Sequence, residues 1–583
     1  MEDCIKVRFA ADSIISSLGF GTYQNISAIA SGQLGVALDR SGEISDGNIM
    51  AGRIARVRLE QFAAESGIEN YSKAEQLIIL SVRDILSQSG LNISEGECAI
   101  IISTTKGEIS SIASGGENMP LWQTSANIAD YFGVSARNVM VISNACISGV
   151  SAIVTAGRLI REGYYESIIV VGVDILSHFI TSGFQSFRSL SEDVCAPYDR
   201  CRCGLNMGEA CGAILLTSRA QNGISGEEIY LLGGAISNDA NHISGPSKTG
   251  DGLYLAMKGA MKEAGLESGA IDAVNLHGTA TSFNDEMESK AMQLSGLADV
   301  PANSLKPYFG HTLGASGVVE TIVSLHQIRQ KIIFATPTYK ENGVSVALNV
   351  SKEHRALPSV TTVLKTASGF GGCNAAIVIS GRSLRNNGSD CKKSCGELLK
   401  IERSCLIENE KIVLNGEKIF GSESDDFHVF IREAFKYAGD GNMKFYKMDN
   451  LCKLGYVAAS FLLNGIELDT QKTAIVLSNS QSSLDTDLKH QKSIENLGDI
   501  GASPAIFVYT LPNIVAGEIC IKHNIKGENT FFVAKEFSPE MLERHILSIA
   551  KYAGIRQFIY GWCEYSGNSY KADIRYGTID WET

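Results

Sequence analysis

Short runs of β-branched residues alternate with segments of helical spacing through the first part of the chain. Continuous apolar runs at residues 99–102, 139–142 and 168–171 predict buried strands. Helical spacing separates these runs at residues 125–132 and 149–162. Strands that alternate with helices are typical of a mostly parallel sheet with helices on both faces. The pattern therefore predicts an α/β fold.

A comparable order of elements begins again after residue 227. We expect a strand at residues 228–232, a helix at 253–264 and a second strand at 273–276. Two related α/β halves, at about 1–227 and 228–383, are thus predicted to form one unit.

The composition changes at residues 382–397, where turn-forming Asn, Gly and Ser residues replace apolar ones. Such a stretch is typical of a linker. We therefore predict that residues 1–383 form one domain, that 384–397 is a linker, and that a second domain covers 398–583.

This C-terminal segment repeats features of the first half in the same order. The matching runs are residues 474–478 with 99–103, and residues 531–533 with 139–141. Where the first copy continues as Ser143-Asn144-Ala145-Cys146, the second reads Ala534-Lys535-Glu536. The tail is therefore predicted to be a diverged copy of the N-terminal half that lacks the cysteine, and its deletion is expected to leave reactions at that cysteine largely intact.

Charge and composition narrow the class of protein. The formal charge of -13 argues against general nucleic-acid binding, which needs a basic surface. The start of the chain lacks the features of a signal peptide, and the apolar run at 500–521 is interrupted by Pro504 and Pro512, so we expect a cytoplasmic protein without a membrane span. The cluster Cys195, Cys201, Cys203 and Cys211 lacks zinc-knuckle spacing, and no metal site is expected.

Cys146 is the first candidate for chemistry. It directly follows a predicted buried strand and precedes Ile147-Ser148-Gly149, where a helix of small residues begins. A cysteine near a helix N-terminus is exposed to backbone amides and a dipole that favour the thiolate. The same amides can stabilise an oxyanion formed when the sulfur attacks a thioester. The alternative is a buried structural cysteine.

Two histidines supply the context. His277 stands where a predicted strand ends and is followed by Gly278-Thr279-Ala280-Thr281, and strand ends that open into loops are favoured places for catalytic groups. Asp285 and Glu288 are suited to anchoring this loop.

His311 lies in the run from Lys306 to Gly317, whose small residues allow a helix to pack closely. Lys306 and Glu320 have the charges to form a buried ion pair that sets the local field, although a purely structural salt bridge fits them equally.

Several separated motifs together resemble the β-ketoacyl synthases of the thiolase superfamily, in the branch that elongates acyl chains on acyl carrier protein. The motifs are Asn144-Ala145-Cys146-Ile147-Ser148-Gly149, His277-Gly278-Thr279-Ala280-Thr281, Gly310-His311-Thr312-Leu313-Gly314, and Gly369-Phe370-Gly371-Gly372-Cys373-Asn374. The resemblance covers most of residues 1–383. It implies a thiolase-like duplicated α-β-α-β-α layered fold, with the tail as an additional thiolase-like half.

The resemblance also implies the chemistry. Cys146 accepts an acyl group, while His277 and His311 bind a malonyl thioester and promote its decarboxylation. Remaining roles are implied as follows: an oxyanion hole from the amides of Cys146 and Phe370, gating by Phe370, substrate binding by Thr279, Thr281, Gly369 and Gly371, and support of the histidines by Lys306 and Glu320.

A separate acyl carrier protein that presents malonyl and acyl thioesters on its phosphopantetheine arm is the implied partner, without further cofactors. A homodimer, or a heterodimer with a related synthase, is implied as well. The alternatives are a thiolase-like coenzyme A acyltransferase and a noncatalytic chain-length or scaffold subunit. Since the latter is expected to lack the nucleophile, it suits the tail better than the main domain.

Overall fold

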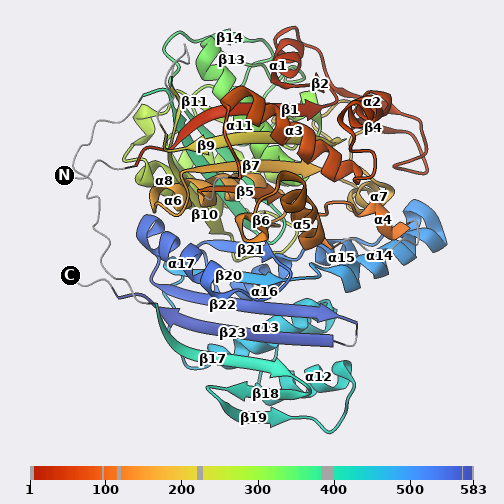
Figure 1. Cartoon of the computed structure of the whole chain (residues 1–583), viewed down its shortest axis with the longest axis vertical. Coiled ribbons are helices and arrows are strands. Elements are labelled where there is room, and N and C mark those ends of the chain that lie inside the picture. Colours follow the sequence, from red (N-terminus) through yellow and green to blue (C-terminus); the bar gives the residue numbers. More distant parts are fainter. Residues whose placement is uncertain are drawn as a thin grey trace.

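The structure is a computed structural model that describes residues 5–94, 97–113, 120–219, 228–382, 399–567 and 569–580. The predicted α/β class is confirmed (Figure 1). The three predicted strands of the first half are β5 (Cys98–Ser103), β6 (Val139–Ile142) and β7 (Ser167–Asp174), and the two predicted helices are α5 (Leu121–Phe132) and α6 (Ser148–Arg161). The predicted boundary at residue 227 and the predicted linker at 384–397 lie outside the described residues.

The N-terminal half is built on a sheet with the strand order β6-β5-β7-β9-β1. β5 is parallel to β6 and β7, whereas β9 (Ala210–Thr217) is antiparallel to both β7 and β1 (Arg8–Ser16). Helix α3 (Lys73–Ser89) covers one face, and α6 and α11 (Ser316–Gln330) cover the other. β5, β6 and β7 are buried throughout, which explains why they are continuous apolar runs.

A second sheet lies on the far side of α6 and α11. Its strand order is β12 (Ala302–Asn303), β11 (Ala273–Asn275), β15 (Thr362–Gly369), β16 (Cys373–Ser380) and β10 (Tyr230–Asn238). Helix α8 (Asp251–Glu263) packs on its outer face together with α9 (Ser282–Leu294). Two sheets that enclose a shared helical layer bring the ends of β6, β11 and β15 towards one region.

The tail repeats the strand order and directions of the N-terminal sheet. β20 (Thr473–Asn479) is parallel to β21 (Asn529–Val533) and β22 (Gln557–Ser566), and β23 (Ser569–Thr578) is antiparallel to β22 and β17 (Lys400–Glu408). β21-β20-β22-β23-β17 therefore corresponds to β6-β5-β7-β9-β1. Two further strands extend the tail sheet as a hairpin, β18 (Lys411–Leu414) and β19 (Glu417–Gly421).

The tail helices are α12 (Phe427–Tyr437), α13 (Asn450–Leu462), α14 (Leu484–Leu497), α15 (Pro504–Phe507), α16 (Ile514–His523) and α17 (Pro539–Ala553). Shorter elements of the first part are β2 (Gly19–Phe20), α1 (Thr22–Ala30), β3 (Val36–Asp39), β4 (Ile49–Gly52), α2 (Arg56–Ser66), α4 (Ser110–Ala113), α7 (His178–Ser186), β8 (Met207–Gly208), α10 (Lys306–Phe309), β13 (Ile332–Ile333) and β14 (Arg355–Ala356).

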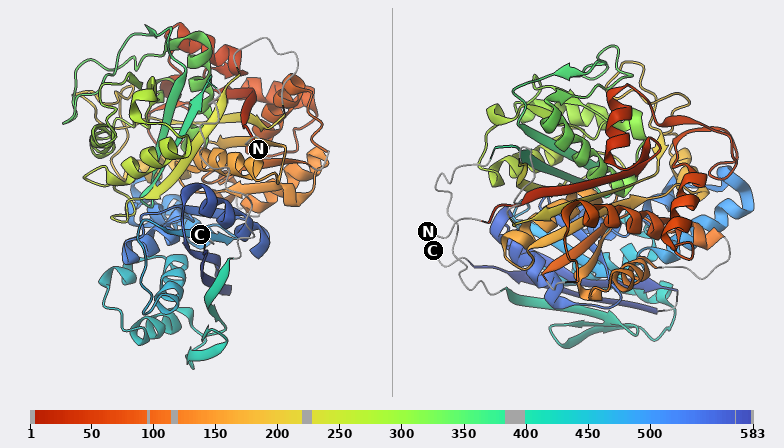
Figure 2. Two further views of the ribbon diagram at one scale, coloured as in Figure 1. Left: turned by 90° about the vertical axis from the view of Figure 1, so that its left-hand side faces the viewer. Right: turned by 45° about the horizontal axis from the view of Figure 1, so that its top comes forward.

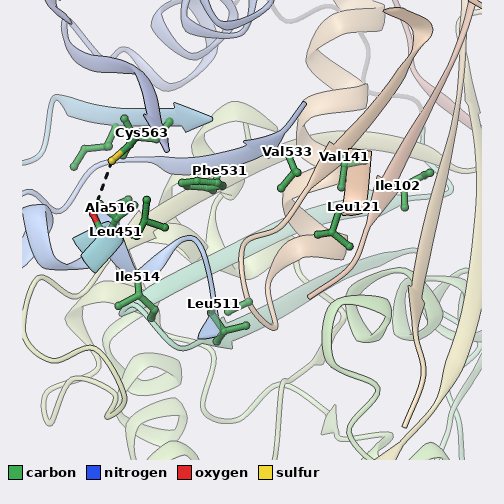
Figure 3. Packing of buried hydrophobic residues seen from close by; sticks show 14 of the residues in the cluster. Ile102, Leu121, Val141, Leu451, Leu511, Ile514, Ala516, Phe531, Val533 and Cys563 are labelled. Carbon is green, nitrogen blue, oxygen red and sulfur yellow. Dashed lines mark hydrogen bonds between the residues drawn. The ribbon is translucent and has the colours of Figure 1, made fainter. Parts of the chain in front are cut away.

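The tail joins the rest of the molecule edge to edge. β21 pairs antiparallel with β6, with Phe532 opposite Ile142 and Val533 opposite Val141. Val141 and Val533 belong to one buried apolar cluster, and Ile142 and Phe532 to another on the opposite face. Figure 3 shows the first of these clusters crossing the junction, and both views of Figure 2 show the tail packed against the rest of the chain. The hydrophobic core is therefore continuous between the two parts.

In the described ranges, no single helix has both the length and the apolar composition needed to cross a membrane. One bent pair, Pro504–Thr510 with Ile514–His523, meets that test only when its two members are taken together, and they meet at 102°.

Candidate active site

Cys146 lies in a tight turn between β6 and α6. The turn places Ala145 at φ 49°, a conformation that residues other than glycine rarely adopt. The Ser148 hydroxyl stabilises the turn, because it accepts a hydrogen bond from the Asn144 amide at 2.7 Å and donates one to the Ala145 carbonyl at 2.6 Å. The end of β15 approaches closely, and a Cβ on Gly369 would lie 3.0 Å from the Cys146 nitrogen. A side chain at this position would therefore crowd the nucleophile turn.

The structure brings both histidines to this turn. His311 Nε2 lies 3.1 Å from Cys146 Sγ, and its Nδ1 lies 3.2 Å from Ser316 Oγ. The His277 ring stands edge-on to the His311 ring, with centroids 5.1 Å apart. His277 Nδ1 is buried and finds no hydrogen-bond partner among the described residues. Since buried polar atoms are rarely left unpaired, this nitrogen is a candidate for contact with substrate.

Burial is the largest influence on the pKa values of Cys146, His277 and His311. Burial raises the pKa of the Cys146 thiol to about 12, against a smaller lowering by Lys306. Burial also holds the pKa of both His277 and His311 well below the usual range, and the nearby Lys306 contributes in the same direction. The two backbone amides next to the sulfur lower the thiol pKa, in the direction expected for a helix N-terminus, but burial raises it by more.

Two backbone amides point at the sulfur. The N–H groups of Cys146 and Phe370 both interact with Cys146 Sγ, and each favours its negative form. Phe370 belongs to a glycine-rich loop in which Gly371 and Gly372 adopt φ of 91° and 70°. This arrangement has the chemistry of an oxyanion hole.

Lys306 and Glu320 form a buried ion pair beneath the histidines. Glu320 binds Lys306 through one carboxylate oxygen and Lys365 through the other, and all three side chains are buried. Lys365 also donates to the Thr366 carbonyl at 2.6 Å. Lys365 was not among the predicted residues, because a lysine within an apolar strand has no motif of its own.

The loop after His277 is held by acidic side chains. Glu288 accepts hydrogen bonds from the amides of His277 at 2.8 Å and Gly278 at 2.7 Å. The hydroxyls of Thr279 and Thr281 lie 2.9 Å apart, with Thr279 buried and Thr281 half-buried. Because their hydroxyls share one hydrogen bond, both threonines retain acceptor capacity for a ligand.

Two features of the site have no counterpart in the predicted set. Asp174, at the end of β7, accepts hydrogen bonds from Thr104 Oγ1 at 2.9 Å and from the Gly314 amide at 2.6 Å, and burial raises its pKa to about 6. It thereby ties the segment after β5 to the segment that carries His311. An acidic residue directly after a buried strand was the available sequence signal.

The second feature is an aromatic cluster next to Cys146 that includes a residue of the tail. Phe184 packs against Phe370, with centroids 6.1 Å apart, and against Phe507, with centroids 5.5 Å apart. Phe507 is buried in the same apolar cluster as Cys146. A Cβ on Gly183 would meet the Phe507 ring at 2.2 Å, so this glycine lets the ring lie close. Nothing in the sequence linked residue 507 to the site.

Among the described residues, the one grouping with metal-ligand spacing is Asp46, His178 and Asp499. His178 Nε2 lies 2.6 Å from Asp499 Oδ1, a hydrogen bond that joins the first part of the chain to the tail. Of the predicted cysteine cluster, Cys195 and Cys211 are buried and Cys201 and Cys203 are exposed.

Comparison with family models identifies two matching segments. Residues 83–222 match the β-ketoacyl synthase N-terminal domain, and residues 230–340 match the β-ketoacyl synthase C-terminal domain. A curated relative, 3-oxoacyl-[acyl-carrier-protein] synthase 2 of Rhizobium meliloti (strain 1021), is 32% identical over 251 residues. That alignment covers 41% of this chain and 59% of the relative, which is less than two thirds of the relative's length.

Solved structures match over longer stretches. The ketosynthase ApeO, solved in complex with its chain length factor ApeC from Xenorhabdus doucetiae, is 26% identical with a TM-score of 0.56, and the match covers 64% of this chain and 98% of that one. The PfaC keto synthase-chain length factor structure has a TM-score of 0.75 at 14% identity, and covers 96% of this chain and 74% of that one. The second match concerns the fold alone, and it extends over the tail.

Proposed function

Since residues 83–222 and 230–340 of this chain belong to the β-ketoacyl synthase family, we propose that the protein is a 3-oxoacyl-[acyl-carrier-protein] synthase. The observation that carries the proposal is His311 Nε2 at 3.1 Å from Cys146 Sγ, with the His277 ring beside it and two amides directed at the sulfur. A thiol, a proton acceptor and an oxyanion hole are the components of acyl transfer through a covalent intermediate.

In the first step, Cys146 Sγ attacks the carbonyl carbon of an acyl thioester and passes its proton to His311. The amides of Cys146 and Phe370 stabilise the oxyanion. The bond from carbon to the carrier's sulfur then breaks, and the carrier thiol leaves with the proton. Because both starting partners are neutral, proton transfer accompanies attack and no resting thiolate is needed.

In the second step, a malonyl thioester binds with its carbonyl oxygen at His277 and His311. The bond to its carboxylate breaks, and carbon dioxide leaves. The two neutral imidazoles donate hydrogen bonds to the enolate that forms. Its carbon attacks the acyl-enzyme carbonyl, and the bond to Cys146 breaks. The thiolate that is released takes up one proton from solvent, which balances the negative charge that the malonyl carboxylate brought in. The product is a 3-oxoacyl thioester two carbons longer.

The surroundings suit this chemistry. Lys306, Lys365 and Glu320 form a buried charged group beside the histidines. Burial, and to a smaller extent the Lys306 and Lys365 charges, lower the pKa of both imidazoles and favour their neutral form. Thr279 and Thr281 would bind the phosphopantetheine arm of an acyl carrier protein, and Gly369 and Gly371 would line the entry beside Phe370. The reaction needs no other cofactor. We place it in the cytoplasm, in fatty-acid or polyketide-type synthesis.

We further propose that the tail is the noncatalytic partner of this synthase, carried within the same chain. Its strand order repeats that of the N-terminal sheet, and it pairs through β21 with β6. Support comes from the fold match to PfaC keto synthase-chain length factor, which spans 96% of this chain, whereas the match to ApeO alone spans 64%. The related partner implied by the resemblance is then supplied in cis.

The test is intact-protein mass spectrometry after incubation with acyl carrier proteins that bear acyl chains of several lengths, followed by malonyl carrier protein. We expect an added acyl mass that disappears as a 3-oxoacyl product forms. Cys146→Ala should abolish acylation. Cys211→Ala is a matched control, because burial raises the pKa of that thiol to about 12 as well. Acylation of the Cys146→Ala variant, or product formation without malonyl carrier, would refute the assignment.

A further inference from the structure

The loop that carries Phe370 is held on several sides by hydrogen bonds. The Gly371 amide donates to the Ile243 carbonyl at 2.6 Å, and the Gly371 carbonyl accepts from Asn238 Nδ2 at 2.8 Å. The Phe370 carbonyl accepts from Asn513 Nδ2 at 2.9 Å. Asn513 belongs to the tail, so the peptide between Phe370 and Gly371 is fixed on one side by the synthase and on the other by the tail.

The tail backbone also packs directly on this loop. Helix α16 follows Asn513, and a Cβ on Gly517 would lie 2.9 Å from the Gly371 oxygen. A Cβ on Gly371 would in turn lie 2.7 Å from Asn513 Nδ2. Glycines on both sides of the contact therefore let the start of α16 reach the loop.

A buried asparagine at position 513 costs folding free energy, so its hydrogen bond to Phe370 calls for a functional explanation. It is fully buried, and its Oδ1 has no hydrogen-bond partner among the described residues. An unpaired buried polar atom destabilises the folded state. The tail asparagine thus donates to the Phe370 carbonyl at 2.9 Å and to Cys373 Sγ at 3.5 Å, and leaves its acceptor unused.

The tail holds the nucleophile turn as well. The Ser143 amide donates to the Phe531 carbonyl at 3.0 Å, and Asn144 Nδ2 donates to the Asn529 carbonyl at 2.8 Å. Both amides directed at Cys146 Sγ therefore belong to segments anchored on the tail.

We propose that Asn513 is a positioning residue for acyl transfer, which holds the Phe370 amide in place in the oxyanion hole by binding the Phe370 carbonyl. This inference rests on the proposed synthase function. The bond anchors the Phe370–Gly371 peptide, and loss of this anchor allows the loop segment that carries the Phe370 amide to shift relative to the sulfur. The role is limited to steps that form an oxyanion at the acyl carbon, and decarboxylation of malonyl carrier protein at the two histidines does not need it.

The experiment separates these half-reactions in the full-length protein. Asn513→Leu has nearly the same size but lacks the donor. We expect single-turnover acylation of Cys146, followed by intact mass, to slow by roughly 10- to 100-fold, less than the loss of a whole oxyanion-hole donor, with decarboxylation unchanged within about twofold. Tyr552→Phe is the matched control. It removes another bond between tail and synthase, from Tyr552 Oη to Glu162 at 2.6 Å, and should change neither rate.

A second variant guards against a purely structural effect. Asn513→Asp keeps the shape, and its carboxyl donates a hydrogen bond only when protonated, a form that burial favours. Its acylation rate relative to wild type should therefore rise as the pH falls. Unchanged acylation in Asn513→Leu overturns the inference, and so does an equal loss of both half-reactions. A wild-type protein that never acylates Cys146 contradicts the synthase function itself, a result distinct from either.

Discussion

A buried ion pair between Lys106 and Asp487 joins the first part of the chain to the tail, and the cost of disrupting it can be calculated. Lys106 Nζ lies 2.6 Å from Asp487 Oδ1, and the two side chains are 4% and 6% exposed. Lys106 also donates to Ser483 Oγ at 3.0 Å and to the Thr510 carbonyl. At an effective dielectric constant of about 20, the attraction at this distance is about 6 kcal/mol.

Desolvation opposes that attraction. Burial lowers the pKa of Lys106 and raises the pKa of Asp487 to about 6, so the charged form of each group is less stable here than in water. Lys106→Met leaves a buried carboxylate without its main partner, and we expect it to lower the free energy of unfolding by about 3–5 kcal/mol at pH 7. Replacing both residues, with Lys106→Met and Asp487→Leu together, should restore stability to about the wild-type value, because the desolvation cost disappears with the pair.

Urea unfolding monitored by tryptophan fluorescence measures these effects, since Trp122 lies in the synthase part and Trp562 in the tail. Lys526→Met is the control. Lys526 also bridges to the synthase, at 2.8 Å from Asp251, but the pair is 26% and 37% exposed and should contribute only about 0–1 kcal/mol. A coupling energy between Lys106 and Asp487 below about 0.5 kcal/mol in the double-mutant cycle would refute the reasoning.

Further predictions address the site and the tail. Phe507→Ala should create space in the apolar cluster beside Cys146 and shift acylation towards longer acyl chains. In a competition between acyl carriers, the relative acylation rate should rise by about fourfold for each added methylene. An unchanged chain-length preference would exclude this ring from the acyl site. Glu320→Gln should leave two buried lysines without their shared carboxylate and lower the free energy of unfolding by about 3–5 kcal/mol. Malonyl decarboxylation should also slow. Wild-type values for both would contradict a role of Glu320 in supporting the histidines. Burial lowers the pKa of His545 from 6.5 to about 3. Its contribution to stability is therefore complete above pH 6.5 and is lost as the pH falls towards 3. In His545→Gln the urea midpoint should fall less steeply between pH 6.5 and pH 3 than in wild type, and an unchanged slope would disprove the linkage. Removal of the tail, residues 398–583, should abolish acylation of Cys146, because it uncovers the β6 edge and releases both segments that carry the oxyanion-hole amides. A folded truncation that is still fully acylated would instead support the expectation drawn from the repeat.

Much of the site was predictable because each element carries its own local signal. Cys146 follows an apolar run and precedes small residues, and His277 stands at a strand end, so each could be recognised without knowing its neighbours. Lys306 is a charged residue among apolar ones, so a buried acidic partner was expected, and its predicted ion pair with Glu320 is present in the structure. Lys365 and Phe507 had no such signal, since a lysine in a strand and a phenylalanine in an apolar run have many ordinary explanations.

By itself, the sequence predicted the α/β class and the repeat of strand order in the tail, and it identified Cys146, His277 and His311 as candidates for chemistry. These properties follow from periodicity and residue type, which are local. Only the tertiary structure decided how far Cys146 is buried and which backbone group Asn513 binds. The thiol pKa depends on how completely the surrounding elements exclude water, and that exclusion raises it. The bond from Asn513 to Phe370 depends on the pairing of β21 with β6, which joins residues that the chain separates by 143 positions.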